Sequence, residues 1–86
     1  MFIYIPEQYT CPEYGIDYSG YDIQTIYNVP NWKTCANYCA NNPSCSFWTW
    51  KIFGFLGDEY VCWLKSSDSG RTKQCNISGS RFCLDD

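Results

Sequence analysis

The sequence predicts a small α+β module that is held together by disulfide bonds. The chain has 86 residues, seven of which are cysteines, and a chain this short is marginal on its hydrophobic core alone. One segment has the spacing of an amphipathic helix, and several short segments alternate as β-strands do. We therefore predict one domain over residues 11–86, preceded by an extension over residues 1–10.

The helix is the clearest element and is predicted over residues 31–42, NWKTCANYCANN. Asn31 follows Pro30 and is a favourable N-cap, and Asn41-Asn42-Pro43 ends the helix. One helical face carries the residues spaced three and four apart, which are Trp32, Cys35, Ala36, Cys39 and Ala40. Both helix cysteines are therefore expected to point toward the core, one turn apart.

Strand patterns flank the helix on both sides. Residues 11–30 contain Gly15 and Gly20 and are expected to form short strands and turns. The segments CSFWTWK (45–51) and YVCWLK (60–65) alternate as strands, and IFGFLGDE between them is typical of a hairpin loop. A polar loop over residues 66–73 and a last short strand, formed by Ile77 and then Arg81 to Leu84, complete the prediction.

Tyrosines recur at positions 14, 18, 21 and 27. A tyrosine has a large apolar face and a polar tip, so it suits half-buried positions as well as contacts with sugars or proteins. We expect most of these four side chains to pack against the sheet.

The N-terminal extension contains a β-branched and aromatic run, Phe2-Ile3-Tyr4-Ile5, that favours a strand. It lies outside the cysteine framework, so its partner strand is unknown. The simpler hypothesis is an edge strand of the chain's own sheet, and the alternative is a strand that pairs with a neighbouring molecule.

Composition excludes several chemistries. The chain has no histidine, which removes the commonest general base and the commonest metal ligand, and its net charge of −3 argues against nucleic-acid binding. The serines at 66, 67 and 69 would need a base, and adjacent Lys65 points to the opposite face of its strand. A phosphate-binding loop would need more glycine than Gly70 and a helix after it.

Metal and carboxylate chemistry is equally unsupported. The cysteine spacings lack paired C-x-x-C knuckles, so disulfides are favoured over zinc. The acidic residues fall in turns and at the C-terminus, where carboxylates are usually solvated: Asp17, Asp22, Asp58, Glu59, Asp85 and Asp86. We predict no enzyme activity, no cofactor and no membrane span, since no apolar stretch approaches the length of a bilayer.

The cysteines suggest a pairing scheme. A short loop can join Cys39 to Cys45 across the helix end, and Cys62 on a central strand fits as the partner of Cys35. Cys11 and Cys83 would then tie the two ends of the module, which leaves Cys75 over.

Three motifs together resemble the PAN/apple domain family over roughly residues 11–83. They are W-K-T-C-A-N-Y-C after a segment ending in N-V-P, the nearby C-S-F-W-T-W, and C-W-L-K-S-S followed by a loop and I-S-G-S-R-F-C. The resemblance implies a curved antiparallel sheet with one helix packed on it. It implies bonds Cys35–Cys62 and Cys39–Cys45, with Cys11–Cys83 in the apple subclass. It also implies a non-enzymatic module that binds proteins or carbohydrates, with no catalytic residues to transfer.

Three further features bear on function. Cys75 is the one cysteine of seven that this pairing scheme leaves without a partner. An odd cysteine favours an intermolecular bond or a bond to another segment over an idle thiol. Asn76-Ile77-Ser78 is an N-glycosylation sequon in a predicted surface loop. Lys65, Arg71 and Lys73 cluster after a strand, and they form either an ordinary solvated surface or a weak patch for an anionic ligand such as a sulfated glycan.

The sequence therefore predicts an extracellular module, because cytosolic thiols would stay reduced. Its expected partners are proteins or glycans at the cell surface or matrix, which makes it an adhesion module. The alternative is a structural subunit that self-assembles into a fibre or matrix. In that case residues 2–5 would add to the sheet of a neighbour, and Cys75 would form an intermolecular disulfide.

Overall fold

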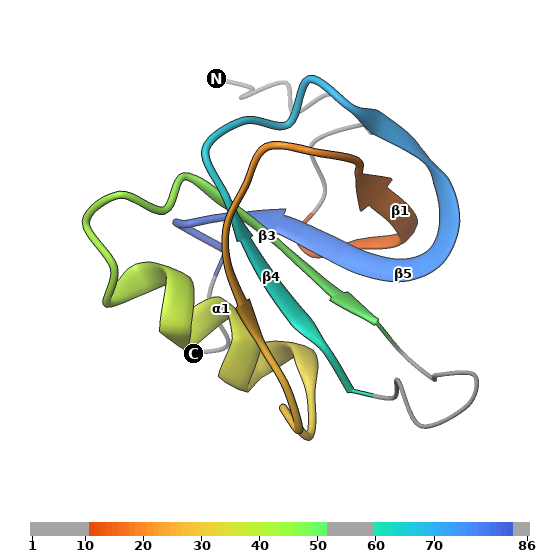
Figure 1. Ribbon diagram of the computed structural model, residues 1–86. Coiled ribbons are helices and arrows are strands. Elements are labelled where there is room, and N and C mark those ends of the chain that lie inside the picture. Colours follow the sequence, from red (N-terminus) through yellow and green to blue (C-terminus); the bar gives the residue numbers. More distant parts are fainter. Residues whose placement is uncertain (1–10, 52–59, 84–86) are drawn as a thin grey trace, which may run out of the picture.

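The computed structural model describes residues 11–51 and 60–83, and within them it shows an antiparallel sheet with one helix packed on one face (Figure 1). The predicted strand over residues 2–5, the predicted hairpin loop over 52–59 and the carboxylates at 58, 59, 85 and 86 lie outside the described residues. The elements in chain order are β1 (Glu13–Tyr18), β2 (Asp22–Ile26), α1 (Trp32–Ala40), β3 (Phe47–Lys51), β4 (Cys62–Lys65) and β5 (Arg71–Ser80).

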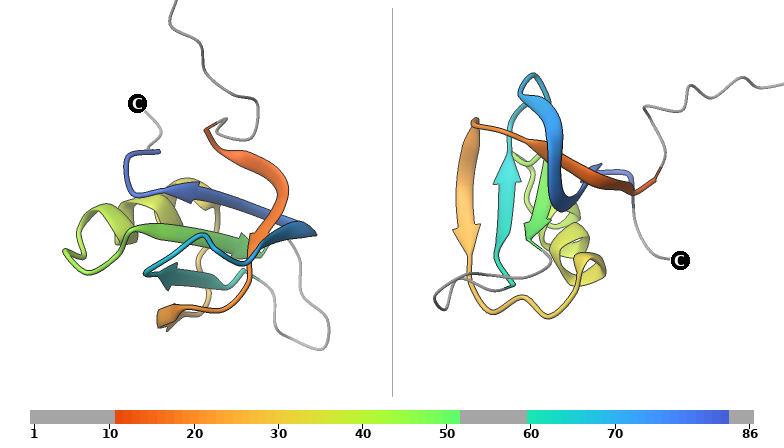
Figure 2. Two further views of the ribbon diagram at one scale, coloured as in Figure 1. Left: turned by 90° about the horizontal axis from the view of Figure 1, so that it is seen from above. Right: turned by 90° about the vertical axis from the view of Figure 1, so that its right-hand side faces the viewer.

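Among the described residues, five strands form the sheet in the order β1-β5-β3-β4-β2, and every pair of neighbours is antiparallel. The helix covers the central strands from one side, and the opposite side carries no helix from the described residues (Figure 2). The predicted α+β class, with a curved antiparallel sheet and one packed helix, is confirmed. Its helix is too short to cross a lipid bilayer.

The helix begins where the sequence indicates. The side-chain oxygen of Asn31 accepts a hydrogen bond of 2.8 Å from the Thr34 backbone N–H, so it satisfies one donor that the first helical turn leaves open. Cys35, Ala36 and Cys39 are fully buried, as predicted for the apolar face. The helix therefore packs its cysteine face on the sheet.

The core between helix and sheet centres on Trp48 of β3. Its ring stacks on that of Trp32 with 5.7 Å between ring centroids, and its Nε1–H donates a hydrogen bond of 3.0 Å to the Ser80 carbonyl. Trp50, two residues along the same strand, donates from Nε1 to the Val29 carbonyl at 2.8 Å. Each buried indole thus has a partner for its polar atom.

Three disulfides join the elements, and their Cα atoms lie 5.2–5.5 Å apart. Cys35–Cys62 links α1 to β4, Cys39–Cys45 closes the chain after α1, and Cys11–Cys83 ties the two ends of the described chain. These are the same pairs that the family resemblance implies. They add constraint to a core that is small for independent stability.

The C-terminal part of the domain differs from the prediction. Residues 71–73, expected in a loop, begin β5, which runs for ten residues and contains Ile77, as expected. The expected continuation of this strand at 81–84 is wrong at Arg81 and Phe82, which form a turn, and Leu84 lies outside the described residues. The first half of β5 is exposed and polar and pairs with β1 alone. A strand held mainly by backbone hydrogen bonds lacks the apolar alternation by which strands are recognised.

A bulge bends β5. Tyr14 of β1 pairs with Ile77 and Ile16 pairs with Lys73, so three residues of β5, 74 to 76, lie opposite Gly15 alone. Gly15 has φ of +74°, a backbone conformation that favours glycine. Such a bulge re-aims the strand and increases its twist, and the sharp curve of β5 is visible in Figure 1. Cys75 and Asn76 sit in this bulge rather than in the predicted surface loop.

The arginine that follows β5 caps the C-terminal end of the helix. Arg81 donates from Nη2 to the Ala40 carbonyl at 3.1 Å and from Nη1 to the Cys45 carbonyl at 2.8 Å. These carbonyls belong to the last residue of α1 and to the loop after it, where free acceptors and the negative end of the helix dipole favour a cation. Arg81 therefore fixes the end of α1 to the end of β5.

The expectation that most tyrosines pack against the sheet is wrong. Tyr18 is buried, whereas Tyr14, Tyr21 and Tyr27 are exposed by 55–67%. The exposed three lie in or beside β1 and β2, which are the two edge strands of the sheet. Edge strands have fewer neighbours to bury a large ring, so these rings remain in solvent.

Candidate functional site

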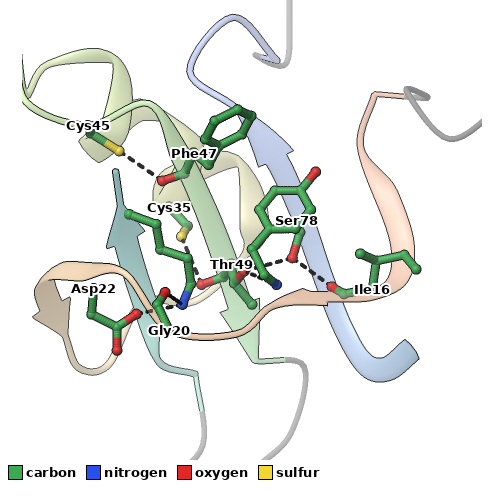
Figure 3. A network of polar contacts seen from close by, with 10 residues as sticks. Ile16, Gly20, Asp22, Cys35, Cys45, Phe47, Thr49 and Ser78 are labelled. Carbon is green, nitrogen blue, oxygen red and sulfur yellow. Dashed lines mark hydrogen bonds and ion pairs between the residues drawn. The ribbon is translucent and has the colours of Figure 1, made fainter. Parts of the chain in front are cut away.

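The sheet face opposite the helix is built on a directed chain of hydrogen bonds (Figure 3). The Tyr18 backbone N–H donates to Thr49 Oγ1 at 3.3 Å, and Thr49 Oγ1 lies 2.7 Å from Ser78 Oγ. Ser78 donates its hydroxyl hydrogen to the Ile16 carbonyl at 2.6 Å. Because that carbonyl can only accept, Thr49 must be the donor to Ser78. These hydrogen bonds hold β1 against β3 and β5 and make this face of the sheet rigid.

A buried carboxylate secures one side of this face. Glu13 is 5% exposed, accepts a hydrogen bond from the Tyr18 hydroxyl, and accepts another of 3.0 Å from Arg71 Nε. Burial is the main cause that raises the pKa of the Tyr18 hydroxyl, and the hydrogen bond to Glu13 and the charge of Glu13 raise it further. The cluster is internally paired, so it acts as a structural clamp.

A second charge pair lies near the turn between β1 and β2. Lys65 is 3% exposed, forms an ion pair with Asp22, and donates a hydrogen bond of 2.9 Å to the Gly20 carbonyl (Figure 3). Gly20 has φ of +81°, so glycine suits the turn that aims its carbonyl at the ammonium group. The buried ammonium group is thus matched by one charge and one carbonyl.

A pocket of about 250 Å³ opens beside this pair. Its lining comes from both edge strands, the turn between them, and strands β4 and β5. The lining residues are Asp17 of β1, Ser19 and Gly20 of the turn, Asp22 of β2, Trp63 and Lys65 of β4, and Asn76 of β5. Trp63 is half-buried on the central strand β4, where it pairs with Thr49 on one side and Thr25 on the other. The side-chain amide of Asn76 has no hydrogen-bond partner among the described residues. The pocket thus combines an indole with polar groups that are available to a ligand.

The lining is not suited to an anion. The Lys65 ammonium is matched by Asp22, and the carboxylate of Asp17 leaves one net negative charge in the lining. Of the three cations considered for an anionic ligand, Lys65 is buried in its ion pair with Asp22, and Arg71 is ion-paired with Glu13. Lys73 is exposed and forms no such ion pair with another described residue.

The loop after β4 does not form a catalytic arrangement. The Ser67 hydroxyl lies 2.7 Å from the Ser69 hydroxyl and accepts a hydrogen bond of 3.0 Å from the Ser69 backbone N–H. The Lys65 ammonium is directed at Gly20 and Asp22 instead. The serines therefore stabilise a turn, and among the described residues no group of three or more cysteines and carboxylates is placed to hold a metal ion.

Cys75 is exposed and takes part in no disulfide. It borders a shallow groove of about 560 Å³ at the bulge, together with Tyr14, Gly15, Ile16, Lys73 and Gln74. Asn76, the next residue, faces the Trp63 pocket instead. The bulge thus presents two adjacent residues with modifiable side chains to two different surfaces.

The sequence does not predict this pocket. The alternation of β4 does place Trp63 and Lys65 on one face, which is a usable signal. Their neighbours Asp17 and Asn76 come from the other half of the sheet and are 59 residues apart in the chain. No local pattern predicts such a meeting.

The described residues thus form a small antiparallel sheet with one helix, three disulfides and a sheet face that no described helix covers. The sequence model of the PAN domain matches residues 16–65, and this chain belongs to the PAN domain family. A search of curated proteins gave no match.

The matched stretch contains α1, β2, β3 and β4 and the disulfides Cys35–Cys62 and Cys39–Cys45. It ends before β5, so Asn76, Cys75 and the Cys11–Cys83 bond lie outside it. PAN domains are generally non-catalytic modules that bind proteins or carbohydrates, and with several disulfides they are typical of extracellular proteins.

Proposed function

We propose that this chain is an extracellular, non-enzymatic recognition module whose Trp63 pocket binds an uncharged sugar at a cell surface or in a matrix. The observation that carries the proposal is the lining itself, which places an indole next to two carboxylates, a hydroxyl and an amide. Carboxylate and amide groups hydrogen-bond sugar hydroxyls, and an aromatic ring packs on the apolar face of a pyranose.

The charge of the pocket selects among glycans. Asp17 gives the lining a net negative charge, because Lys65 is already neutralised by Asp22. A sulfated or carboxylated glycan would have to approach this charge without a free cation to compensate it. The pocket is therefore suited to neutral sugars rather than to the sulfated glycan that the sequence suggested as an alternative.

The test is sugar binding by refolded, unglycosylated protein with its disulfides formed. The probes are galactose, mannose, N-acetylglucosamine and a sulfated heparin-derived oligosaccharide, and binding is followed by saturation-transfer NMR and tryptophan fluorescence. We expect at least one neutral sugar to bind and the sulfated probe to bind more weakly. Trp63→Ala should abolish binding, and Asp17→Asn should weaken it while leaving the fold intact.

The matched control is Tyr38→Ala. Tyr38 is an exposed aromatic residue on α1, and α1 covers the opposite face of the sheet. Its loss should leave sugar binding unchanged. Binding that survives both Trp63→Ala and Asp17→Asn, or preference for the sulfated probe, would refute the proposal.

A second candidate function, self-assembly into a fibre or matrix, is favoured by the exposed Cys75 and by β1 and β2, whose outer edges pair with no other described strand. The chain enters the sheet at β1, and β2 is the opposite edge. A strand formed by residues 2–5 and added to β2 would therefore come from a neighbouring copy, which gives an open head-to-tail assembly. The other six cysteines are bonded within the chain, so the intermolecular disulfide would join Cys75 of two copies and would cross-link neighbouring assemblies.

Intact mass of native material, measured before and after reduction, tests this second candidate. Multimers that collapse on reduction and are absent in Cys75→Ser support an assembly bond. Removal of residues 1–10 should abolish association while leaving sugar binding intact. A monomer mass with Cys75 available to an alkylating reagent would contradict the assembly role.

A further inference from the structure

We propose that an N-linked glycan on Asn76 folds into the Trp63 pocket of its own chain. The pocket would then be filled from within when Asn76 is glycosylated and open to external sugar when it is not. This inference rests on the proposed function, because it concerns the same pocket and the same class of ligand.

Asn76 is placed at the rim of the pocket by β5. Its side chain is half-buried and lines the pocket, and its amide nitrogen has no partner among the described residues. Asn76 is also the first residue of the sequon Asn76-Ile77-Ser78. A sugar bonded to this nitrogen therefore starts at the pocket.

Strand register gives the distance that the sugar has to cover. Asn76 pairs with Lys51 of β3, Ser78 pairs with Thr49, and Thr49 pairs with Trp63 of β4. Asn76 and Trp63 thus lie on the same face, two strands and one row of residues apart. Neighbouring strands are about 4.8 Å apart and successive residues on one face are about 6.7 Å apart along a strand, so roughly 12 Å separates the two backbone positions, a gap that one or two sugar rings attached to Asn76 can bridge.

The timing of the modification follows from Ser78. Its hydroxyl is fully buried in the chain formed by Thr49, Ser78 and Ile16. A glycosyltransferase has to reach the whole sequon, so it must act before β5 joins β3. In that step the Asn76 amide nitrogen bonds to C1 of N-acetylglucosamine carried on a lipid pyrophosphate. The C1–O bond breaks, the lipid pyrophosphate leaves, and the amide proton passes to a base of the transferase.

Tethering favours the chain's own sugar over an external one. A group held by a short linker meets its site at an effective concentration in the millimolar range, without the translational entropy cost of free binding. The first sugar also buries its apolar face on an indole that is already held in place by β4. A weakly binding external sugar is therefore displaced.

The test compares three forms of the protein. The first is secreted from a eukaryotic host and carries the whole glycan, the second is the same material trimmed by an endoglycosidase to a single N-acetylglucosamine, and the third is the unglycosylated protein, refolded with its disulfides formed. NMR should show nuclear Overhauser contacts between the N-acetyl methyl group of the trimmed sugar and the Trp63 indole ring. The trimmed form should bind external sugar at least tenfold more weakly than the unglycosylated protein does.

Two results would overturn the inference. One is an unmodified Asn76 in secreted protein, established by peptide mass. The other is a glycosylated form that shows no contact with Trp63 and binds external sugar as well as the unglycosylated protein does. If the unglycosylated protein binds no sugar although the glycan contacts Trp63, the inference stands and the proposed function fails.

Discussion

Gly79 of β5 lies directly against the indole ring of Trp48 on β3. The two residues pair across the strands, and a Cβ atom at Gly79 would come within 2.7 Å of Trp48 Cζ2 and 3.1 Å of the Cys83 Cβ. No side chain fits in this space, so glycine allows the ring to lie flat on the neighbouring strand. The contact couples the core under α1 to the strand that carries Asn76.

Replacement of Gly79 by alanine should therefore lower the free energy of unfolding by about 1–3 kcal/mol, the usual cost of overpacking a well-packed core. Urea denaturation followed by far-ultraviolet circular dichroism measures this change. The same substitution in a Trp48→Leu background should cost less, since the smaller side chain can move aside. Equal costs in both backgrounds would show that the ring contact is not the cause.

Thr49→Val should lower the free energy of unfolding by about 1–3 kcal/mol, because it deprives the Tyr18 N–H of its acceptor and the Ser78 hydroxyl of its donor in a buried place. Valine has nearly the same shape, so packing is preserved. The matched control is Thr25→Val on the exposed edge strand β2, in the same cross-strand row, where we expect a change close to zero. Equal losses at both positions would contradict the role of the hydrogen-bond chain.

The Cys35→Ala/Cys62→Ala double variant should lose about 2–5 kcal/mol of stability, because this bond joins α1 to β4. Removing both sulfurs avoids an unpaired buried thiol. Thermal denaturation under non-reducing conditions is the measurement, and Cys75→Ser, which breaks no intrachain bond, serves as the control. An unchanged melting temperature in the double variant would refute the pairing.

Alkaline pH should destabilise the fold through Tyr18. Burial and Glu13 raise the pKa of its hydroxyl above the ordinary value of 10.0. Above that value the unfolded chain has lost the Tyr18 proton while the folded chain keeps it, so stability falls as the pH rises. Below it the contribution is fully present.

The measurement is urea denaturation between about pH 8 and about pH 11, in a Cys75→Ser background that prevents thiol exchange at high pH. Tyr18→Phe should be less stable at neutral pH and should show a shallower decline above pH 10. Tyr14→Phe is the control, because Tyr14 is 67% exposed and should keep the full decline. Identical slopes for Tyr18→Phe and the parent protein would contradict the prediction.

Helix α1 shows what local information is sufficient to predict. Its start is set by the cap at Asn31, and its buried face is set by Cys35, Ala36 and Cys39, all within nine residues. The alternation in β3 and β4 is equally local. These elements match the prediction because the physics that forms them acts over one or two turns of chain.

The basic residues show where local information fails. Lys65, Arg71 and Lys73 are close in sequence, yet their side chains lie in different environments of the folded domain. Lys65 is neutralised by Asp22, 43 residues away in the chain, and Arg71 by Glu13, 58 residues away. Charge counted along the sequence therefore left a basic patch and a solvated surface as alternatives, and it could not show which cations would be ion-paired.

The sequence by itself determined the class of fold, the helix with its cap, the central strands and a cysteine framework compatible with one pairing scheme. Short-range spacing and side-chain chemistry suffice for these. The tertiary structure decided the length and bend of β5, the end of α1 held by Arg81, and the meeting of Trp63, Asp17 and Asn76 in one pocket. Each of these depends on which distant strands become neighbours, and that is fixed by the packing of the whole domain rather than by any single segment.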